Sequence, residues 1–307
     1  MGRRKGRAIS GWLVIDKPVG LTSTAVVTRV RILTGAAKVG HGGTLDPLAS
    51  GVLPIALGEA TKTVSYAMDG NKTYHFRLRW GEATATDDAE GAVTETSPHR
   101  PDQAAIEAAL PRFTGDIEQI PPAYSAIKVE GKRAYDLARS NQPIELKSRI
   151  VHISSIRLLG CPDPDHADFE VSSGKGAYMR ALARDLARAL GTVGHVVRLR
   201  RLKVGPFTES QAISLEKLEE LSHSPAASDP WLPIETVLDD IPALALTEAE
   251  VRRLKGGQPV SLLRVAARLP LSSIPTDPLV RVMGEGRLAA LARIEDGEIR
   301  PIRVFNH

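Results

Sequence analysis

The sequence predicts an α+β protein in which helices flank a mixed, largely antiparallel sheet and a small β-rich module follows at the C-terminus. Helix-like and strand-like segments alternate without a regular βαβ repeat, which disfavours a doubly wound parallel sheet. The 307 residues are enough for about two domains. Prolines interrupt the chain repeatedly between 222 and 242. We therefore expect one domain over 1–243 and a second over 244–307.

The first predicted helix spans 22–35. Val26, Val30 and Leu33 recur at i, i+4 and i+7, which places them on one helix face, and Gly35 is typical of a helix end. We expect this helix to cover part of the core.

A second helix is predicted over 178–190, before Gly191. Its leucines fall on one face and its arginines roughly on the opposite face, so one face suits the core and the other carries charge. These residues are Leu182, Leu186 and Leu190, and Arg180, Arg184 and Arg188. Two shorter helices are predicted around 106–113 and 134–138.

Segments rich in β-branched and aromatic residues predict strands in both domains. In the larger domain they lie at 73–80, 150–158 and 168–172. In the C-terminal module a helix over 247–255 and a glycine turn precede strands at 279–283, 288–294 and 299–305. Asp296 and Gly297 predict a hairpin turn between the last two strands. These short strands indicate a compact, barrel-like module.

Composition excludes several classes of protein. The chain has one cysteine, Cys161, so an intramolecular disulfide and the Pro-Cys-x-x-Cys zinc site of nucleobase deaminases are both excluded. No apolar run reaches the ~18 residues of a membrane helix. The basic segment 1–7 lacks the apolar stretch of a signal peptide. We expect a cytoplasmic protein with no membrane segment.

Charge is distributed unevenly along the chain. The formal net charge is +4, and four cations without an acid lie between Arg3 and Arg7, so the rest of the chain is neutral overall. Clusters of each sign predict a basic and an acidic face. Solvated charge runs are the alternative interpretation. The clusters are Arg198, Arg200, Arg201 and Lys203, and Glu82, Asp87, Asp88, Glu90 and Glu95.

The loop 39–51 concentrates three glycines, His41 and the pair Asp46-Pro47. It lacks the Gly-Lys-Ser/Thr ending of a phosphate loop and the third glycine of a dinucleotide fingerprint. Two interpretations of Asp46 stay open from spacing alone. It is either a site carboxylate or the N-cap of a short helix that begins at Pro47. His41 is likewise either a site residue or a hydrogen-bonded structural histidine.

Two further segments carry candidate functional residues. The glycine-flanked turn 172–178 leads into the arginine-bearing helix, where a first-turn arginine can reach a carboxylate. Surface charge is the alternative role for Lys175 and Arg180. In the segment 119–139, cations are interleaved with tyrosines, a combination that suits RNA because bases stack and phosphates need neutralising.

Several motifs, in order along 10–240, resemble those of the bacterial tRNA pseudouridine-55 synthases, the TruB family. The opening segment 11–23 resembles the first family motif, and 40–51 is similar to the catalytic loop. Further matching segments are 57–62, 72–74, 86–91, 119–128 and 175–180. The tail from 244 is similar to the PUA-type RNA-binding module of that family. The resemblance also implies that about 119–150 is an RNA-gripping insertion in a catalytic pseudouridine synthase domain.

The resemblance implies an isomerase that detaches uracil from ribose at uridine 55 of the tRNA T-loop and reattaches it through carbon 5. The expected partner is the tRNA T-stem-loop, with no cofactor, metal or obligate protein partner, and the protein is expected to be a monomer. Two alternatives are an RNA-binding protein without catalysis and a synthase acting on ribosomal RNA. The second alternative is disfavoured by the long 119–139 segment.

The resemblance assigns roles to individual residues. Asp46 is the expected nucleophile, since a carboxylate can capture one fragment transiently, and Arg180 is expected to pair with it and hold it ionised. Tyr74 is expected to stack on the uracil, and base flipping brings the nucleotide into the pocket. The expected substrate-binding residues are His41, which takes the space vacated by the base, Lys62, Asp88, Tyr178 and Leu199.

Overall fold

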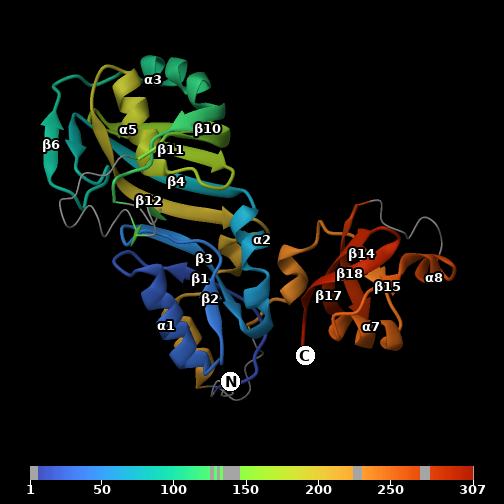
Figure 1. Ribbon diagram of the computed structural model, residues 1–307. Coiled ribbons are helices and arrows are strands. Elements are labelled where there is room, and N and C mark those ends of the chain that lie inside the picture. The colour runs from blue at the N-terminus through green and yellow to red at the C-terminus, as the bar shows by residue number, and fades with distance from the viewer. Residues whose placement is uncertain are drawn as a thin grey trace.

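The computed structural model describes residues 6–124, 128–129, 132–133, 146–223, 230–269 and 277–306 (Figure 1). Within these ranges, nine strands form one mixed sheet and five form a second, C-terminal sheet. Figure 1 shows the two sheets as separate lobes, with helix α2 (Val64–Asp69) on the side of the larger lobe that faces the smaller one. The predicted α+β class is confirmed.

Strand β12 lies in the centre of the main sheet and joins its two halves. The path runs β1, β3, β12, β4, β11, β10, β7. All neighbours along it are antiparallel except β12 and β3, which are parallel. Short strands β2 and β13 pair with β3 and β12. The bounds are β1 Gly11–Lys17, β2 Val39–His41, β3 Ala49–Leu57, β4 Lys72–Trp80, β7 Gly115–Gln119, β10 Arg149–Asp163, β11 His166–Ser173, β12 Gly194–Val204 and β13 Phe207–Thr208.

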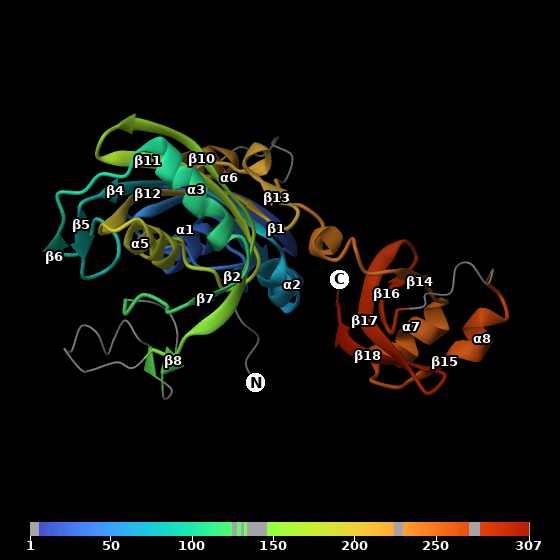
Figure 2. The same cartoon turned by 90° about the horizontal axis from the view of Figure 1, so that it is seen from above.

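Helices cover one face of this sheet (Figure 2). Apolar residues of helices and strands form one continuous core there, for example Val26, Leu182 and Leu218 against Ile55 and Phe76. Burying such side chains contributes about 1.5–3 kcal/mol each to stability. The helices are α1 Ser23–Thr34, α3 Gln103–Ala109, α5 Met179–Ala189 and α6 Leu215–Ser222.

The predicted helices over 22–35 and 178–190 are confirmed. The Thr22 side chain caps α1 by accepting from the Ala25 amide at 3.1 Å, and Gly35 ends it in the left-handed conformation at φ 64°. The third predicted helix is shorter than expected. Its α-helical part is α3, and the residues around Pro111 continue as a 3-10 turn, because proline has no amide hydrogen to donate. The helix predicted around 134–138 lies outside the described residues.

The opposite face of the main sheet is polar along β4 and β11. Cross-strand ion pairs join Arg77 to Asp168 at 2.7 Å and His75 to Glu170 at 2.8 Å. Such alternation of an apolar and a polar face is typical of antiparallel strands with one solvated side. The predicted strands at 73–80, 150–158 and 168–172 are therefore confirmed.

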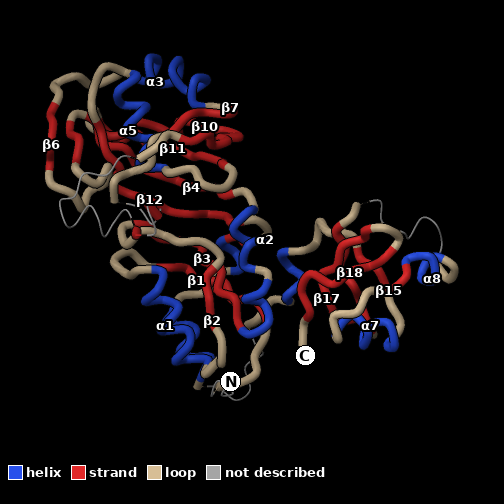
Figure 3. The backbone as a smooth tube through the Cα atoms, viewed as in Figure 1, coloured by secondary structure: helices blue, strands red, loops and turns tan. Residues whose placement is uncertain are grey.

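The C-terminal sheet has the order β14, β16, β17, β18, β15. Figure 3 shows helices α7 and α8 beside its strands. Its predicted hairpin is confirmed, because Asp296 and Gly297 have φ of 53° and 73° and connect β17 to β18. The bounds are β14 Ala243–Ala245, α7 Glu248–Lys255, β15 Val260–Ser261, α8 Leu262–Ala266, β16 Leu279–Gly284, β17 Arg287–Glu295 and β18 Glu298–Val304. The remaining elements are η1 Gly58–Lys62, β5 Glu82–Thr84, β6 Val93–Thr96, η2 Leu110–Phe113, β8 Lys128–Val129, β9 Lys132–Arg133, η3 Glu209–Gln211 and η4 Ile234–Val237.

The C-terminal sheet docks on the face of β1 and β3 that the helices leave open. Phe305 is fully buried in a cluster that includes Trp12 and Ala60. Lys62 donates to the Val304 carbonyl at 2.7 Å, so its amine faces this interface. These contacts fix the C-terminal module on the main sheet.

The two charge clusters do not form the expected faces. Arg201 is buried at 2% exposure, and Asp88 at 1%. Arg200 pairs with Asp16 at 3.0 Å, and Asp87 with Arg184 at 2.9 Å. The prediction of solvent-facing charge is wrong for Arg201 and Asp88, which are buried, whereas Arg200 is partly exposed and pairs with Asp16 and Glu209. No helix in the described ranges is both long and apolar enough to cross a membrane.

Candidate active site

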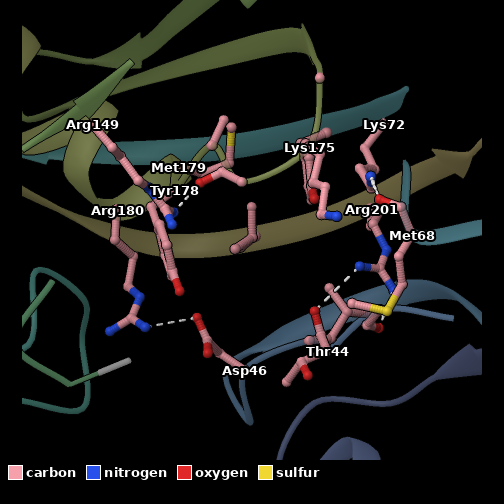
Figure 4. Close-up of a pocket in the computed structure, with 17 residues that line it drawn as sticks. Thr44, Asp46, Met68, Lys72, Arg149, Lys175, Tyr178, Met179, Arg180 and Arg201 are labelled. Carbon is pink, nitrogen blue, oxygen red and sulfur yellow. Dashed lines mark hydrogen bonds and ion pairs between the residues drawn. The ribbon is translucent and has the colours of Figure 1, made fainter. Parts of the chain in front are cut away.

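A pocket of about 310 Å³ opens where the loop before β3, the central strands and the start of α5 converge (Figure 4). This volume lies near the lower end of the range typical of small-ligand sites. Five of the predicted site residues line it, namely Asp46, Tyr74, Tyr178, Arg180 and Leu199. In Figure 4, Arg180 and Arg201 lie on opposite sides of Asp46.

The Asp46 loop is held by backbone contacts on both sides. The Ser23 hydroxyl bonds to the Leu45 amide at 2.8 Å and to the Leu45 carbonyl at 3.0 Å. The Pro47 carbonyl accepts from the Gly20 amide at 2.8 Å. Asp46 itself lies in a turn that runs directly into β3, so its alternative role as a helix N-cap is wrong. Its carboxylate is therefore free to face the pocket.

Arg180 connects Asp46 to a second carboxylate. Its guanidinium lies 3.0 Å from Asp46 and 3.1 Å from Asp88, and its side chain is only 4% exposed. It also donates to the carbonyls of Thr86 at 2.8 Å and Tyr124 at 2.9 Å. Its alternative role as a surface charge is wrong. Charge-assisted hydrogen bonds of this kind fix the orientation of a carboxylate.

The groups around Asp46 shift the pKa of its carboxyl in opposite directions. Burial raises the pKa of this carboxyl, Arg180 lowers it, and the neighbouring Asp88 charge raises it again. Burial wins, so the pKa of Asp46 lies above the usual value for an aspartate. A carboxylate with a perturbed pKa in a pocket is typical of a functional site.

Tyr178 is held in place at the start of α5. Its backbone amide donates to the Gln119 side-chain oxygen at 3.0 Å. The Arg149 guanidinium lies 5.0 Å from the centre of the Tyr178 ring, a cation–π contact. Arg149 also donates to the Gly176 carbonyl, and this fixes the turn before α5. The ring thus forms a rigid wall of the pocket.

Three predicted substrate-binding residues lie outside the pocket lining. Asp88 lies behind Arg180, where the Glu90 amide donates to it at 3.0 Å. Lys62 lies at the interface with the C-terminal sheet. His41 lies on β2 with an enclosed Nδ1 that has no hydrogen-bond partner within the described ranges. Burial and the Arg201 charge lower the pKa of His41, so its imidazole is neutral at pH 7.

Besides Lys175, which lines the pocket and pairs with Asp69 at 2.6 Å, three cations of the pocket were missed as site residues. Lys72 donates to the Gly70 carbonyl at 2.5 Å, and burial lowers the pKa of its amine to about 8. Arg149 and Arg201 complete the set. Strand alternation offers a signal for Arg201, because it shares a face with Leu199 two residues earlier. Lys72 offers the same signal, because it shares a face of β4 with Tyr74 two residues later, whereas Arg149 carries no comparable pattern. No cluster of three or more potential metal ligands occurs among the described residues.

Family models match most of the chain. Residues 31–179 match the N-terminal domain of the TruB family of pseudouridylate synthases, and residues 180–254 match the C-terminal domain of tRNA pseudouridylate synthase B. The chain is 63% identical to the tRNA pseudouridine synthase B of Rhodospirillum rubrum, over 99% of each chain. It is 53% identical to that of Caulobacter sp. strain K31, over 99% of this chain and 98% of the other.

Solved structures share the fold. A chain of a Cbf5–Nop10–Gar1 complex superposes with a TM-score of 0.72 at 24% identity, over 96% of this chain and 84% of that one. A chain of an H/ACA RNP bound to a substrate RNA gives 0.71 at 22% identity, over 97% and 85%. These structures show that the fold is shared. The family models and the identities to the bacterial relatives place the chain in the TruB family of pseudouridylate synthases.

Proposed function

We propose that this chain converts uridine 55 in the T-loop of tRNA to pseudouridine, with Asp46 as the nucleophile. The observation that carries the proposal is the Asp46 carboxylate, which faces the pocket 3.0 Å from the Arg180 guanidinium. The relatives that carry the name tRNA pseudouridine synthase B align over 99% of this chain and supply the substrate class.

The reaction breaks the bond from N1 to C1′, forms a bond from C5 to C1′, moves the C5 proton away and returns a proton to N1. A carboxylate can capture one fragment while the base turns, because it is a nucleophile and a leaving group. Asp46 is the proposed nucleophile in either case, whether it attacks the sugar carbon or the uracil ring. Arg180 opposes the effect of burial on this carboxyl, since an opposite charge lowers a carboxyl pKa.

The aromatic and apolar lining suits a flipped base. Tyr74 stacks on the uracil and lies where the C5 proton leaves, while Tyr178 and Leu199 enclose the ring. Asp88 does not line the pocket, and it acts on the site through its ion pair with Arg180. His41, neutral and with an unpaired Nδ1, takes the place of the base in the RNA. Lys62 contacts the RNA backbone only if the interface with the C-terminal sheet adjusts, because its amine is engaged there.

The partner of this site is the tRNA T-stem-loop. The cations around the pocket suit it, because phosphates must be neutralised on binding. In this proposal 1–243 is the catalytic domain and 244–307 a PUA-like RNA-binding domain. The RNA-gripping insertion, about 119–150, falls mainly outside the described residues. A monomer in the cytoplasm, acting without an obligate protein partner, stays a prediction.

The function is tested by mapping pseudouridine, position by position, in an unmodified tRNA transcript incubated with the purified chain and no added cofactor. We expect product at position 55 and none in a matched transcript with cytidine there. Product at another uridine would contradict the target. Tight binding without product would favour the RNA-binding alternative over catalysis.

The raised pKa of Asp46 predicts an acid limb in the pH profile. Only the ionised carboxylate is a nucleophile, so the single-turnover rate should fall tenfold per pH unit below that pKa, which lies above the ordinary value. Asp88→Asn removes a charge that raises the Asp46 pKa. The acid limb in the pH profile of this variant should therefore move to lower pH, even if its plateau rate drops. The measurement is the rate on saturating enzyme at several pH values, with the folded state checked by circular dichroism. An unmoved limb in Asp88→Asn would contradict this assignment.

A further inference from the structure

Arg201 is a buried cation behind the pocket that the reaction described above does not use. We propose that Arg201 is a positioning residue, which fixes the loop before Asp46 against Tyr74 so that nucleophile and base-stacking ring keep one relative geometry. The inference rests on the proposed function, because it concerns the same reaction.

The side chain of Arg201 binds the Asp46 loop directly. Its guanidinium donates to the Gly43 carbonyl at 3.0 Å and to the Thr44 carbonyl at 3.2 Å, three and two residues before Asp46 (Figure 4). A third bond, to the Val52 carbonyl at 2.8 Å, reaches past the turn into β3. One planar group thus holds the chain on both sides of Asp46.

The strand register places Arg201 between the two groups that it is proposed to align. On one side Arg201 pairs with Gly51 of β3, and on the other with Tyr74 of β4. A Cβ atom at Gly51 would lie 2.2 Å from the Arg201 carbonyl, so only glycine permits this approach. The backbone of Arg201 is therefore fixed between the loop-bearing strand and the Tyr74 strand.

Arg201 is a buried charge whose position is not explained by a contribution to the stability of the fold. It is 2% exposed, and in the described part of the chain no carboxylate forms an ion pair with it. Burial lowers its pKa, while the adjacent Tyr74 hydroxyl and the Asp46 charge oppose this. Removing a charge from water costs free energy, and here no ion pair among the described residues offsets that cost. The N–H groups of its guanidinium instead donate to backbone carbonyls on both sides of Asp46.

The test compares Arg201→Gln and Arg201→Lys with Arg200→Gln. Arg200 is the neighbour whose side chain points to the other face and pairs with Asp16 and Glu209. On saturating enzyme, we expect Arg201→Gln to lower the single-turnover rate about 100-fold, the typical effect of a ~1 Å misplacement. Arg201→Lys should recover part of this, Arg200→Gln should keep the wild-type rate, and the Kd for tRNA should change less than about threefold.

Two readouts separate positioning from a merely structural role. Amide hydrogen exchange of 42–48 should accelerate in Arg201→Gln while the core of α5 keeps its protection. In a double-mutant cycle, the rate loss of Arg201→Gln should be smaller in a Tyr74→Phe background, because the hydroxyl beside the guanidinium is already gone.

The inference would be overturned if the rate losses of Arg201→Gln and Tyr74→Phe simply multiplied in the double variant. It would also be overturned if the rate loss of Arg201→Gln matched its loss of folded protein. Arg201→Lys retains the charge and one donor, so it keeps the test valid if Arg201→Gln does not fold. An inactive wild-type chain would instead contradict the proposed function. An active wild type with an equally active Arg201→Gln would contradict only the role of Arg201.

Discussion

Asp46→Asn is expected to abolish pseudouridine formation while leaving the fold intact. Asparagine matches the shape of aspartate, and Arg180 keeps its contacts with Asp88 and two backbone carbonyls. The amide cannot act as the nucleophile, so we expect a rate loss of about 10⁴-fold or more, as for other catalytic nucleophiles. The measurement is single-turnover product formation on the tRNA transcript, together with the Kd for that RNA, which should stay near the wild-type value.

Asp168→Asn is a matched control for this variant. Asp168 is also paired with an arginine, Arg77, at 2.7 Å, but on the solvated face of β11. We expect wild-type turnover, because exposed ion pairs contribute only about 0–1 kcal/mol and none of its contacts reach the pocket. A rate for Asp46→Asn within tenfold of this control would refute the nucleophile assignment.

Arg180→Met is expected to impair stability and activity together. It leaves the Asp88 carboxylate buried without its cation and removes the charge that lowers the Asp46 pKa. Breaking a buried ion pair from one side typically costs about 3–5 kcal/mol. Asp46 should then stay protonated to higher pH, and we expect the rate at neutral pH to fall by about 100-fold or more. Urea unfolding and single-turnover rates at two pH values provide the measurement.

Two variants separate the effects of the Arg180 charge. Arg184→Met removes the next arginine on α5, which pairs with Asp87 and Asp185 away from the pocket. It should lose stability but keep the wild-type rate per folded molecule. Arg180→Met combined with Asp88→Asn should regain part of the lost stability and stay inactive. Equal stability of Arg180→Met and the wild type would show that the buried carboxylates do not need this cation.

Local sequence signals predicted the elements well where one physical cause decided them. The helix over 22–35 follows from its cap, its apolar spacing and Gly35, and the last hairpin follows from Asp296-Gly297. The shortened third helix shows where a competing cause wins, because Pro111 ends the α-helical hydrogen bonding. Asp46 is a second example. Its position before Pro47 is typical of a helix N-cap, but contacts from Ser23 and Gly20 hold this segment as a turn.

The site was less predictable than the fold because its parts come from distant segments. The resemblance supplied the five residues that line the pocket, and no local pattern joins Asp46 to Arg180. The inward position of Arg201 was hidden in a run of cations that looks like a surface cluster. Lys62 was mispredicted for a different reason, because its packing against the C-terminal sheet depends on how the two sheets meet.

During synthesis, the two halves of the main sheet leave the ribosome before the strand that joins them. The half with β1 and β3 contains the Asp46 loop, which lies between these two strands in the sequence, and the half with β4 and β11 carries Tyr74 and leads into α5. Strand β12 is made last and inserts between them, where Leu199 pairs with Ala49 in parallel. Pairings between residues so far apart in the chain form slowly. We therefore expect a nascent or prematurely ended chain to lack a catalytic centre, so that the RNA meets only a fully made protein.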